Sequence, residues 1–92
     1  MQTYILLTCN PGHEKEVITH LRSIKGVLEV SGIWGEYDIF LKVEHDAEFG
    51  LDRFVEILRK IENITSTYTM PILFGQGELS MIRKIKKLVA SN

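Results

Sequence analysis

The sequence predicts a small α+β domain whose elements follow the order strand, helix, strand, strand, helix, strand. Short runs of strand-favouring residues alternate with stretches in which apolar residues recur every three or four positions. The chain also divides into two similar strand-helix-strand halves, residues 2–32 and 37–71. The first and third strands are the most apolar, so they are expected in the middle of an antiparallel sheet of order 4-1-3-2. These features together predict a ferredoxin-like βαββαβ fold.

The first half opens with an apolar run, Thr3 to Cys9, that is typical of a central strand covered on both faces. Pro11 and Gly12 end it. A helix is expected from Glu14 to Lys25, with Gly26 closing it in a left-handed conformation. The residues of its apolar face are Val17, Ile18, Leu21 and Ile24. Val27 to Ser31 follows as the second strand.

The second half begins with the strand Ile39 to Val43, in which Ile39, Leu41 and Val43 share an aliphatic face. Asp46 is a suitable N-cap for the second helix, whereas Gly50 weakens its first turn by roughly 1 kcal/mol relative to alanine. That helix has an apolar stripe of Leu51, Phe54, Val55, Leu58 and Ile61. Ile64 to Met70 alternates as a half-exposed edge strand, and Pro71 fits an edge.

A glycine-rich hinge, Gly75-Gln76-Gly77, separates this body from a final amphipathic helix. We therefore divide the chain into a domain of residues 1–74 and a helical extension of residues 75–92. Residues 76–92 hold four basic side chains against one acidic, for a net charge of +3, and residues 1–75 have a net charge of −4. The body is thus a poor partner for nucleic acid. The tail residues Arg83 to Lys87 are compatible with phosphate or membrane contacts, or with a plain solvated helix face.

Composition and length indicate one soluble domain near the lower size limit for a single core. No signal peptide or membrane-spanning stretch is visible, and the single cysteine, Cys9, reads as a small buried hydrophobe. The expected location is the cytoplasm. Because helices cover one face of the sheet, the face with Phe40 needs a partner. We expect a homodimer paired face to face, which forms a dimeric α/β barrel.

Residues for catalysis or metal binding are sparse. His13 and His20 lie seven positions apart and lack the spacing of a helical metal pair. Glu36 and Asp38 offer an acid-base pair or, more commonly, acceptors for turn amides. We expect no catalytic residues, no metal and no cofactor.

The turn between the halves holds the least generic residues, Gly32 to Asp38. Gly35 lets a ligand approach the backbone, whose amides bind carboxylates. Trp34 and Tyr37 offer apolar walls with polar edges, and Asp38 accepts from an ammonium group. An amino acid fits this set. A plain strand connection, with the aromatics packed at an interface, fits the residues equally well.

The string Gly35-Glu36-Tyr37-Asp38, followed by the apolar-Lys-Val strand Ile39 to Val43, resembles the Gly-x-Tyr-Asp block of the Lrp/AsnC (feast/famine) regulators. Other matches to their effector domain, called RAM, are Pro11-Gly12, the helix exit from Leu21 to Val27, and Thr65-x-Thr67-x-Thr69. The resemblance covers about residues 2–73. It implies ferredoxin-like dimers that assemble further, frequently into octamer-like rings, with amino-acid effectors bound between dimers.

The resemblance also implies the residues of an effector site. One wall is formed by Trp34, Gly35, Glu36, Tyr37 and Asp38, and Thr67 and Thr69 lie opposite on another subunit. Family members usually carry a small polar residue in place of Trp34, so the pocket is narrowed, altered or closed here. They also begin with a helix-turn-helix domain, whereas the first strand starts here at residue 3.

The leading hypothesis is a stand-alone, non-enzymatic module that binds an amino acid or similar small effector and self-assembles. It would modulate transcription indirectly, including by co-assembly with full-length regulators, without direct DNA or membrane binding. One alternative is a small dimeric α/β-barrel enzyme of the oxygenase or isomerase type. A further alternative is nucleic-acid binding through the basic C-terminal helix.

Overall fold

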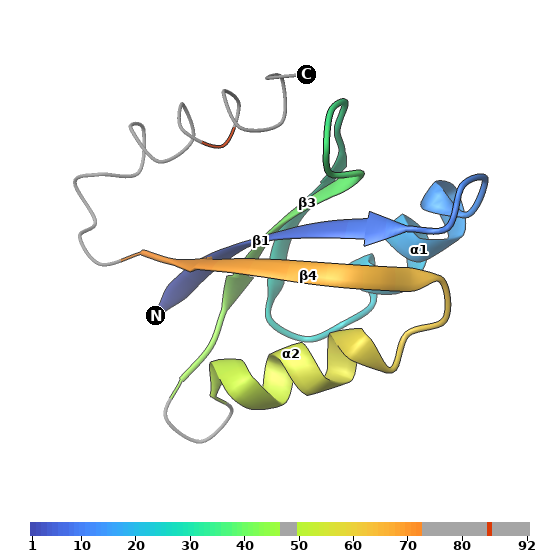
Figure 1. Cartoon of the computed structure of the whole chain (residues 1–92). Coiled ribbons are helices and arrows are strands. Elements are labelled where there is room, and N and C mark those ends of the chain that lie inside the picture. The colour runs from blue at the N-terminus through green and yellow to red at the C-terminus, as the bar shows by residue number, and fades with distance from the viewer. Residues whose placement is uncertain (47–49, 73–84, 86–92) are drawn as a thin grey trace.

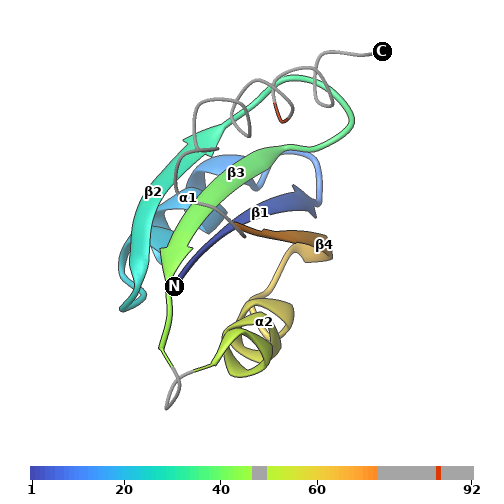
Figure 2. The same cartoon turned by 90° about the vertical axis from the view of Figure 1, so that its left-hand side faces the viewer.

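The computed structural model describes residues 1–46, 50–72 and 85 (Figure 1). Its elements are β1 (Gln2–Cys9), α1 (Glu14–Arg22), β2 (Val27–Gly32), β3 (Ile39–Glu44), α2 (Leu51–Arg59) and β4 (Ile64–Pro71). The four strands form one antiparallel sheet in the order β2-β3-β1-β4, with both helices beside it (Figure 2). Read from the other edge, this order is 4-1-3-2. The predicted ferredoxin-like α+β fold is therefore confirmed.

The main core lies between the sheet and the two helices. Its strand residues alternate along β1 and β3, and its helix residues recur at three- or four-residue spacing, as each period requires. Helix α1 lies against β2, and helix α2 lies against β4. The buried members of this cluster are Ile5, Leu7, Cys9, Val17, Leu21, Ile39, Leu41, Val43, Phe54, Leu58 and Ile61.

The opposite face of the sheet carries a second cluster, in which Tyr4, Leu6 and Ile85 are buried. Partly buried apolar residues pack against them: Ile33, Tyr37, Phe40, Met70 and Ile72. The rings of Tyr4 and Phe40 are 5.3 Å apart between centroids. A residue of the C-terminal segment, Ile85, thus packs on the face that was expected to meet a second subunit. The face-to-face dimer itself concerns a second copy and stays a prediction.

Gly26 adopts the expected left-handed conformation, with φ of 97°. A Cβ added there would lie 2.8 Å from the carbonyl oxygen of Glu44 and 3.2 Å from the ring of Phe54. The backbone amide of Glu44 also donates a 2.7 Å hydrogen bond to the Gly26 carbonyl. Glycine is required here by both its dihedral angle and the close approach of β3.

Two helix boundaries differ from the sequence prediction. Helix α1 ends at Arg22, before Lys25, and the N-cap of α2 is Gly50, so the expectation that Asp46 caps α2 is wrong. Gly50 has an extended conformation (ψ 168°), and glycine serves at an N-cap almost as well as a polar residue. The predicted hinge at 75–77, the amphipathic helix and its basic residues lie outside the described residues, apart from the helical Ile85.

Candidate functional site

The turn between β2 and β3 is pinned to the end of β1 by backbone hydrogen bonds. The amide of Asp38 donates to the carbonyl of Leu7 at 2.8 Å, and the amide of Ile33 donates to the carbonyl of Asp38 at 2.9 Å. Gly35 has φ of 142°, a conformation that a residue with a side chain rarely adopts. The position of the turn is therefore fixed by its hydrogen bond to the central strand β1.

The Asp38 carboxylate takes part in this anchoring. Its Oδ2 accepts a 2.8 Å hydrogen bond from the backbone amide of Cys9, at the point where the pairing of β1 with β4 shifts register. The structure therefore gives Asp38 the amide-accepting role that the sequence left as the commoner alternative to acid-base chemistry. Its predicted contact with an effector ammonium stays a prediction.

Cys9 lies beneath this turn and is almost fully buried. Burial raises the pKa of its thiol, and the nearby carboxylates of Asp38 and Glu14 raise it further. All three effects disfavour the thiolate, which is the nucleophilic form of cysteine. Cys9 accordingly acts as a small hydrophobic core residue, as the sequence indicated.

Tyr37 points across the face of the sheet that lies away from the helices. Its ring stacks on that of Tyr68 in β4, with centroids 6.0 Å apart and planes at 16°. Tyr37 is half-buried and belongs to the second cluster, whereas Tyr68 remains 46% exposed. The Tyr37 ring therefore joins the turn to the edge strand, and its predicted role as a wall for a ligand stays a prediction.

Trp34 projects into solvent, with 91% of its surface exposed, and Glu36 is also exposed. Within one chain, the indole of Trp34 does not fill or close the turn. An exposed tryptophan on a well-anchored turn is the kind of side chain that becomes buried at protein interfaces.

Thr67 and Thr69 lie on the other side of the sheet from Tyr37. They pair with Leu7 and Ile5 of β1, whose side chains belong to the main core under the helices. Tyr68, which stacks on Tyr37, lies between them in sequence, and neighbouring strand residues point to opposite faces. One chain therefore does not bring the turn and the two threonines into a common cavity.

The threonines instead line two hollows along the edge formed by β4 and α2. One hollow, of about 330 Å³, is lined by Arg59, Ile64, Thr65, Ser66 and Thr67. The other, of about 420 Å³, is lined by Leu51, Asp52, Val55, Glu56, Arg59, Thr67 and Thr69. We call the two together the edge groove. Arg59 and Thr67 line both parts.

The sequence did not single out Arg59, Glu56 or Asp52, which line this groove. Their helical pattern marks them only as the polar side of α2. The available signal was the short connection from Lys60 to Asn63, since a brief helix-to-strand link keeps the last helical turn close to the strand that follows.

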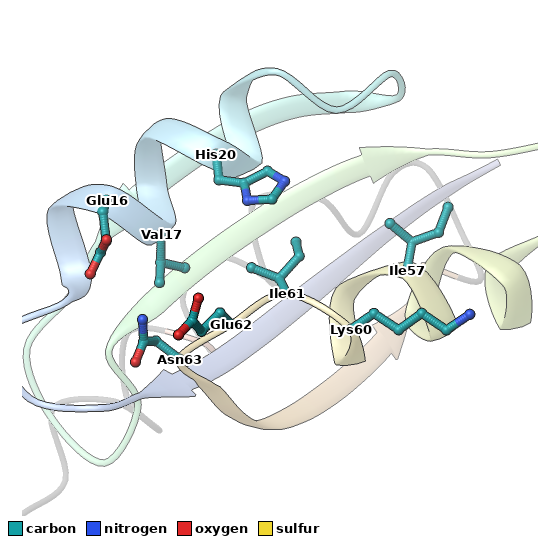
Figure 3. Close-up of a pocket in the computed structure, with 8 residues that line it drawn as sticks. All are labelled: Glu16, Val17, His20, Ile57, Lys60, Ile61, Glu62 and Asn63. Atoms are coloured by element: carbon teal, nitrogen blue, oxygen red, sulfur yellow. The ribbon is translucent and has the colours of Figure 1, made fainter.

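A third hollow, of about 400 Å³, lies between α1 and the connection from α2 to β4 (Figure 3). Glu16, Glu62 and Asn63 gather at one end of it, and Lys60 extends towards the other. Two of these polar groups are already engaged within the chain. Glu16 contacts the ring of His13, and the Asn63 side chain accepts a 3.1 Å hydrogen bond from Asn10.

Within residues 1–46, 50–72 and 85, no group of three or more histidine, cysteine or carboxylate side chains is arranged to hold a metal. His45 is buried, and its Nε2 lies 2.8 Å from the hydroxyl of Thr3. In the same part of the chain, no helix has the length and apolarity needed to cross a membrane.

Comparison with known proteins identifies the family. Residues 2–85 match the model of the Lrp/AsnC ligand binding domain. The HTH-type transcriptional regulator FL11 of Pyrococcus abyssi is 27% identical over 73 residues, which are 79% of this chain and 48% of that protein. The chain thus spans about half the length of this regulator. Homocitrate synthase of Sulfolobus acidocaldarius is 42% identical over 50 residues, 54% of this chain but only 11% of the enzyme.

Solved structures with the same fold agree with this family assignment. Hypothetical protein PHS023 from Pyrococcus horikoshii is 38% identical with a TM-score of 0.70, covering 82% of this chain and 93% of that one. The transcriptional regulator NMB0573 from Neisseria meningitidis, solved as an L-Met complex, has a TM-score of 0.69 at 19% identity, covering 80% of this chain and 50% of that one, and so shows the shared fold. This chain belongs to the Lrp/AsnC family, through a ligand-binding domain matched over residues 2–85.

Proposed function

We propose that this chain binds an amino acid or a similar small effector and self-assembles, and that it modulates transcription indirectly. The observation that carries the proposal is the match of residues 2–85 to a ligand-binding domain of transcriptional regulators. The L-Met complex of the Neisseria protein supports an amino acid as the ligand class. The anchored turn with Gly35, Tyr37 and Asp38 offers such a ligand an aromatic wall and, at Gly35, a close approach to the backbone.

The geometry of the two half-sites favours a site between copies. Tyr37 and the threonine pair, Thr67 and Thr69, lie on opposite faces of the sheet, so a pocket that uses both needs two chains. Because such a pocket needs two chains, an effector binds more tightly to the assemblies that bring the two half-sites together than to those that do not. It therefore shifts the balance among dimers and larger rings by differential affinity. If the chain co-assembles with longer regulators of the family, effector binding would change their assembly and, through it, their DNA binding.

A screen of the twenty common amino acids tests this function. Isothermal titration calorimetry measures binding of each, and light scattering measures the assembly mass with and without it. Trp34 is the only tryptophan of the chain and lies in the predicted site, so its emission should shift to shorter wavelength when the turn becomes covered. A Trp34→Phe variant identifies the origin of that signal. Absence of heat, emission change and mass change with all twenty would overturn the proposal.

The homocitrate synthase match supports a shared binding module and not that enzyme's reaction, because it involves only 11% of the enzyme. The family is regulatory, and the space between sheet and helices is filled by the aliphatic main core with a protonated Cys9. Nucleic-acid binding by the C-terminal helix would depend on Arg83, Lys84, Lys86 and Lys87, which lie outside the described residues. It stays an alternative from the sequence.

A further inference from the structure

The sheet face that lies away from the helices is already covered at its centre within one chain. Tyr4 and Leu6 lie on the central strand β1, and neither exposes any of its surface. Phe40 of β3 lies opposite Leu6, and Met70 of β4 lies opposite Tyr4. Ile85 packs in this same cluster and is only 4% exposed. A residue from beyond β4 therefore occupies the face on which a second copy was expected to pair.

The sequence around Ile85 has the two-sided pattern of a helix that lies on an apolar surface. Ile85 itself is helical. In a helix, the positions three and four residues away on either side share its face, and all four are apolar: Met81, Ile82, Leu88 and Val89. The positions one and two residues away are all basic: Arg83, Lys84, Lys86 and Lys87. These eight residues lie outside the described part of the chain, and the pattern is that of the sequence alone.

A helix that carries Ile85 and a second copy of the sheet cannot cover this face together. Sheets that pack face to face lie about 10 Å apart. An α-helix with its side chains is about 10–12 Å across, so a helix seated on Tyr4 and Leu6 fills the space that a facing sheet needs. The apolar side chains that would pair two copies are also the ones that contact Ile85. Docking of this segment and face-to-face pairing are therefore alternatives.

We propose that the C-terminal segment, residues 79–89, competes with a second copy for the sheet face and must undock before two copies pair face to face. This inference rests on the self-assembly in the proposed function and concerns its regulation. Docking joins two parts of one chain, so its equilibrium does not depend on protein concentration. Pairing of two copies does depend on concentration. The segment therefore keeps chains apart at low concentration and is displaced at high concentration.

The competition acts twice in each dimer, because both copies must open the face. An apparent affinity falls in proportion to the fraction of chains in the competent state. A face that is open in about one chain in ten therefore raises the dimer dissociation constant about a hundredfold. Tyr37 of the central turn packs against the same cluster, so undocking also changes the surroundings of the candidate effector site.

The substitution Ile85→Glu in the full chain tests the competition. A carboxylate that would have to be buried opposes docking and leaves the sheet face itself unchanged. Sedimentation over a range of concentrations should show the dimer dissociation constant fall by at least about tenfold. Adding Met70→Glu places a charge on the opened face and should abolish the gained dimer. Lys86→Gln is the matched control: it also lowers the net charge by one unit, and it should assemble as the unmodified chain does.

Trypsin measures the docking directly, because it cleaves after basic residues and four of these flank Ile85. Cleavage of a docked segment waits for it to open, so it should be slow in the unmodified chain. The cleavage rate should also be independent of protein concentration below the dimer dissociation constant, because the cover belongs to the same chain. Ile85→Glu should be cleaved at least about tenfold faster.

Three results would contradict the inference. Weaker assembly of Ile85→Glu would mean that the segment joins copies instead of separating them. Unchanged assembly, at any cleavage rate, would mean that the segment does not compete. Rapid cleavage of the unmodified chain would mean that it is not docked. Circular dichroism establishes that each variant folds, and Ile85→Ser carries the same test if Ile85→Glu does not. A chain that binds none of the twenty amino acids would refute the proposed effector binding and leave this inference standing, since its measurements need no ligand.

Discussion

The hydrogen bond from the Cys9 amide to Asp38 makes a quantitative prediction about the central turn. Asp38→Ala removes the acceptor and leaves a partly buried backbone amide without a protein partner. Bonds of this kind to a charged group contribute about 1.5–3 kcal/mol, and loss of an acceptor from a partly buried amide costs about 1–3 kcal/mol. We therefore expect the free energy of unfolding to fall by about 1–3 kcal/mol. Asp38→Asn keeps an acceptor oxygen and should lose about half as much.

The assay is urea denaturation monitored by circular dichroism, at one protein concentration for all variants because assembly shifts apparent stability. Glu36→Gln is the matched control, since it neutralises an exposed carboxylate of the same turn. Its stability should stay within about 0.5 kcal/mol of the unmodified chain.

The Asp38 substitutions can also be measured through the reactivity of the Cys9 thiol. The Asp38 carboxylate contributes to the raised pKa of the Cys9 thiol, so Asp38→Asn should lower that pKa and speed reaction with a thiol reagent at fixed pH. Glu36→Gln should leave the labelling rate unchanged. An Asp38→Ala variant as stable as Glu36→Gln, with the same labelling rate, would refute the anchoring role of Asp38.

Three further predictions concern the core and pH. Gly26→Ala should lower the free energy of unfolding, measured by urea denaturation, by more than about 2 kcal/mol, and Gly12→Ala should lower it by about 1 kcal/mol. Both glycines have positive φ, but only Gly26 lies close to a backbone carbonyl, that of Glu44. Equal losses would contradict this close approach. Ile85→Ala should cost about 2–4 kcal/mol through the cavity left in the second cluster, and a loss below 0.5 kcal/mol would exclude that packing. Because its pKa is raised, Cys9 should contribute stability below the ordinary thiol pKa that is lost as pH rises through the folded value; a Cys9→Ala chain should lack this alkaline decline.

Much of the fold follows from local patterns in the sequence. The period-two strands, the helix stripes of Val17 and Leu21 or Phe54 and Leu58, and the apolar centre of β1 and β3 led directly to the sheet order. The left-handed Gly26 was also predictable, because a glycine between a helix and a strand has few other roles. The start of α2 was not predictable in this way. Asp46 and Gly50 both meet the local requirements for an N-cap, and local preference alone did not separate them.

The candidate site depended on tertiary structure to a greater degree. The residues by themselves pointed to the turn with Gly35, Tyr37 and Asp38, and the family resemblance implied the threonines of β4 as its counterpart; both assignments stay predictions. Only the folded chain shows that Asp38 binds the Cys9 amide, that Tyr37 stacks on Tyr68, and that Arg59 shares a groove with Thr67. These contacts join residues far apart in the chain, and strand register and sheet order decide them, whereas sequence periodicity reports only which face a residue occupies.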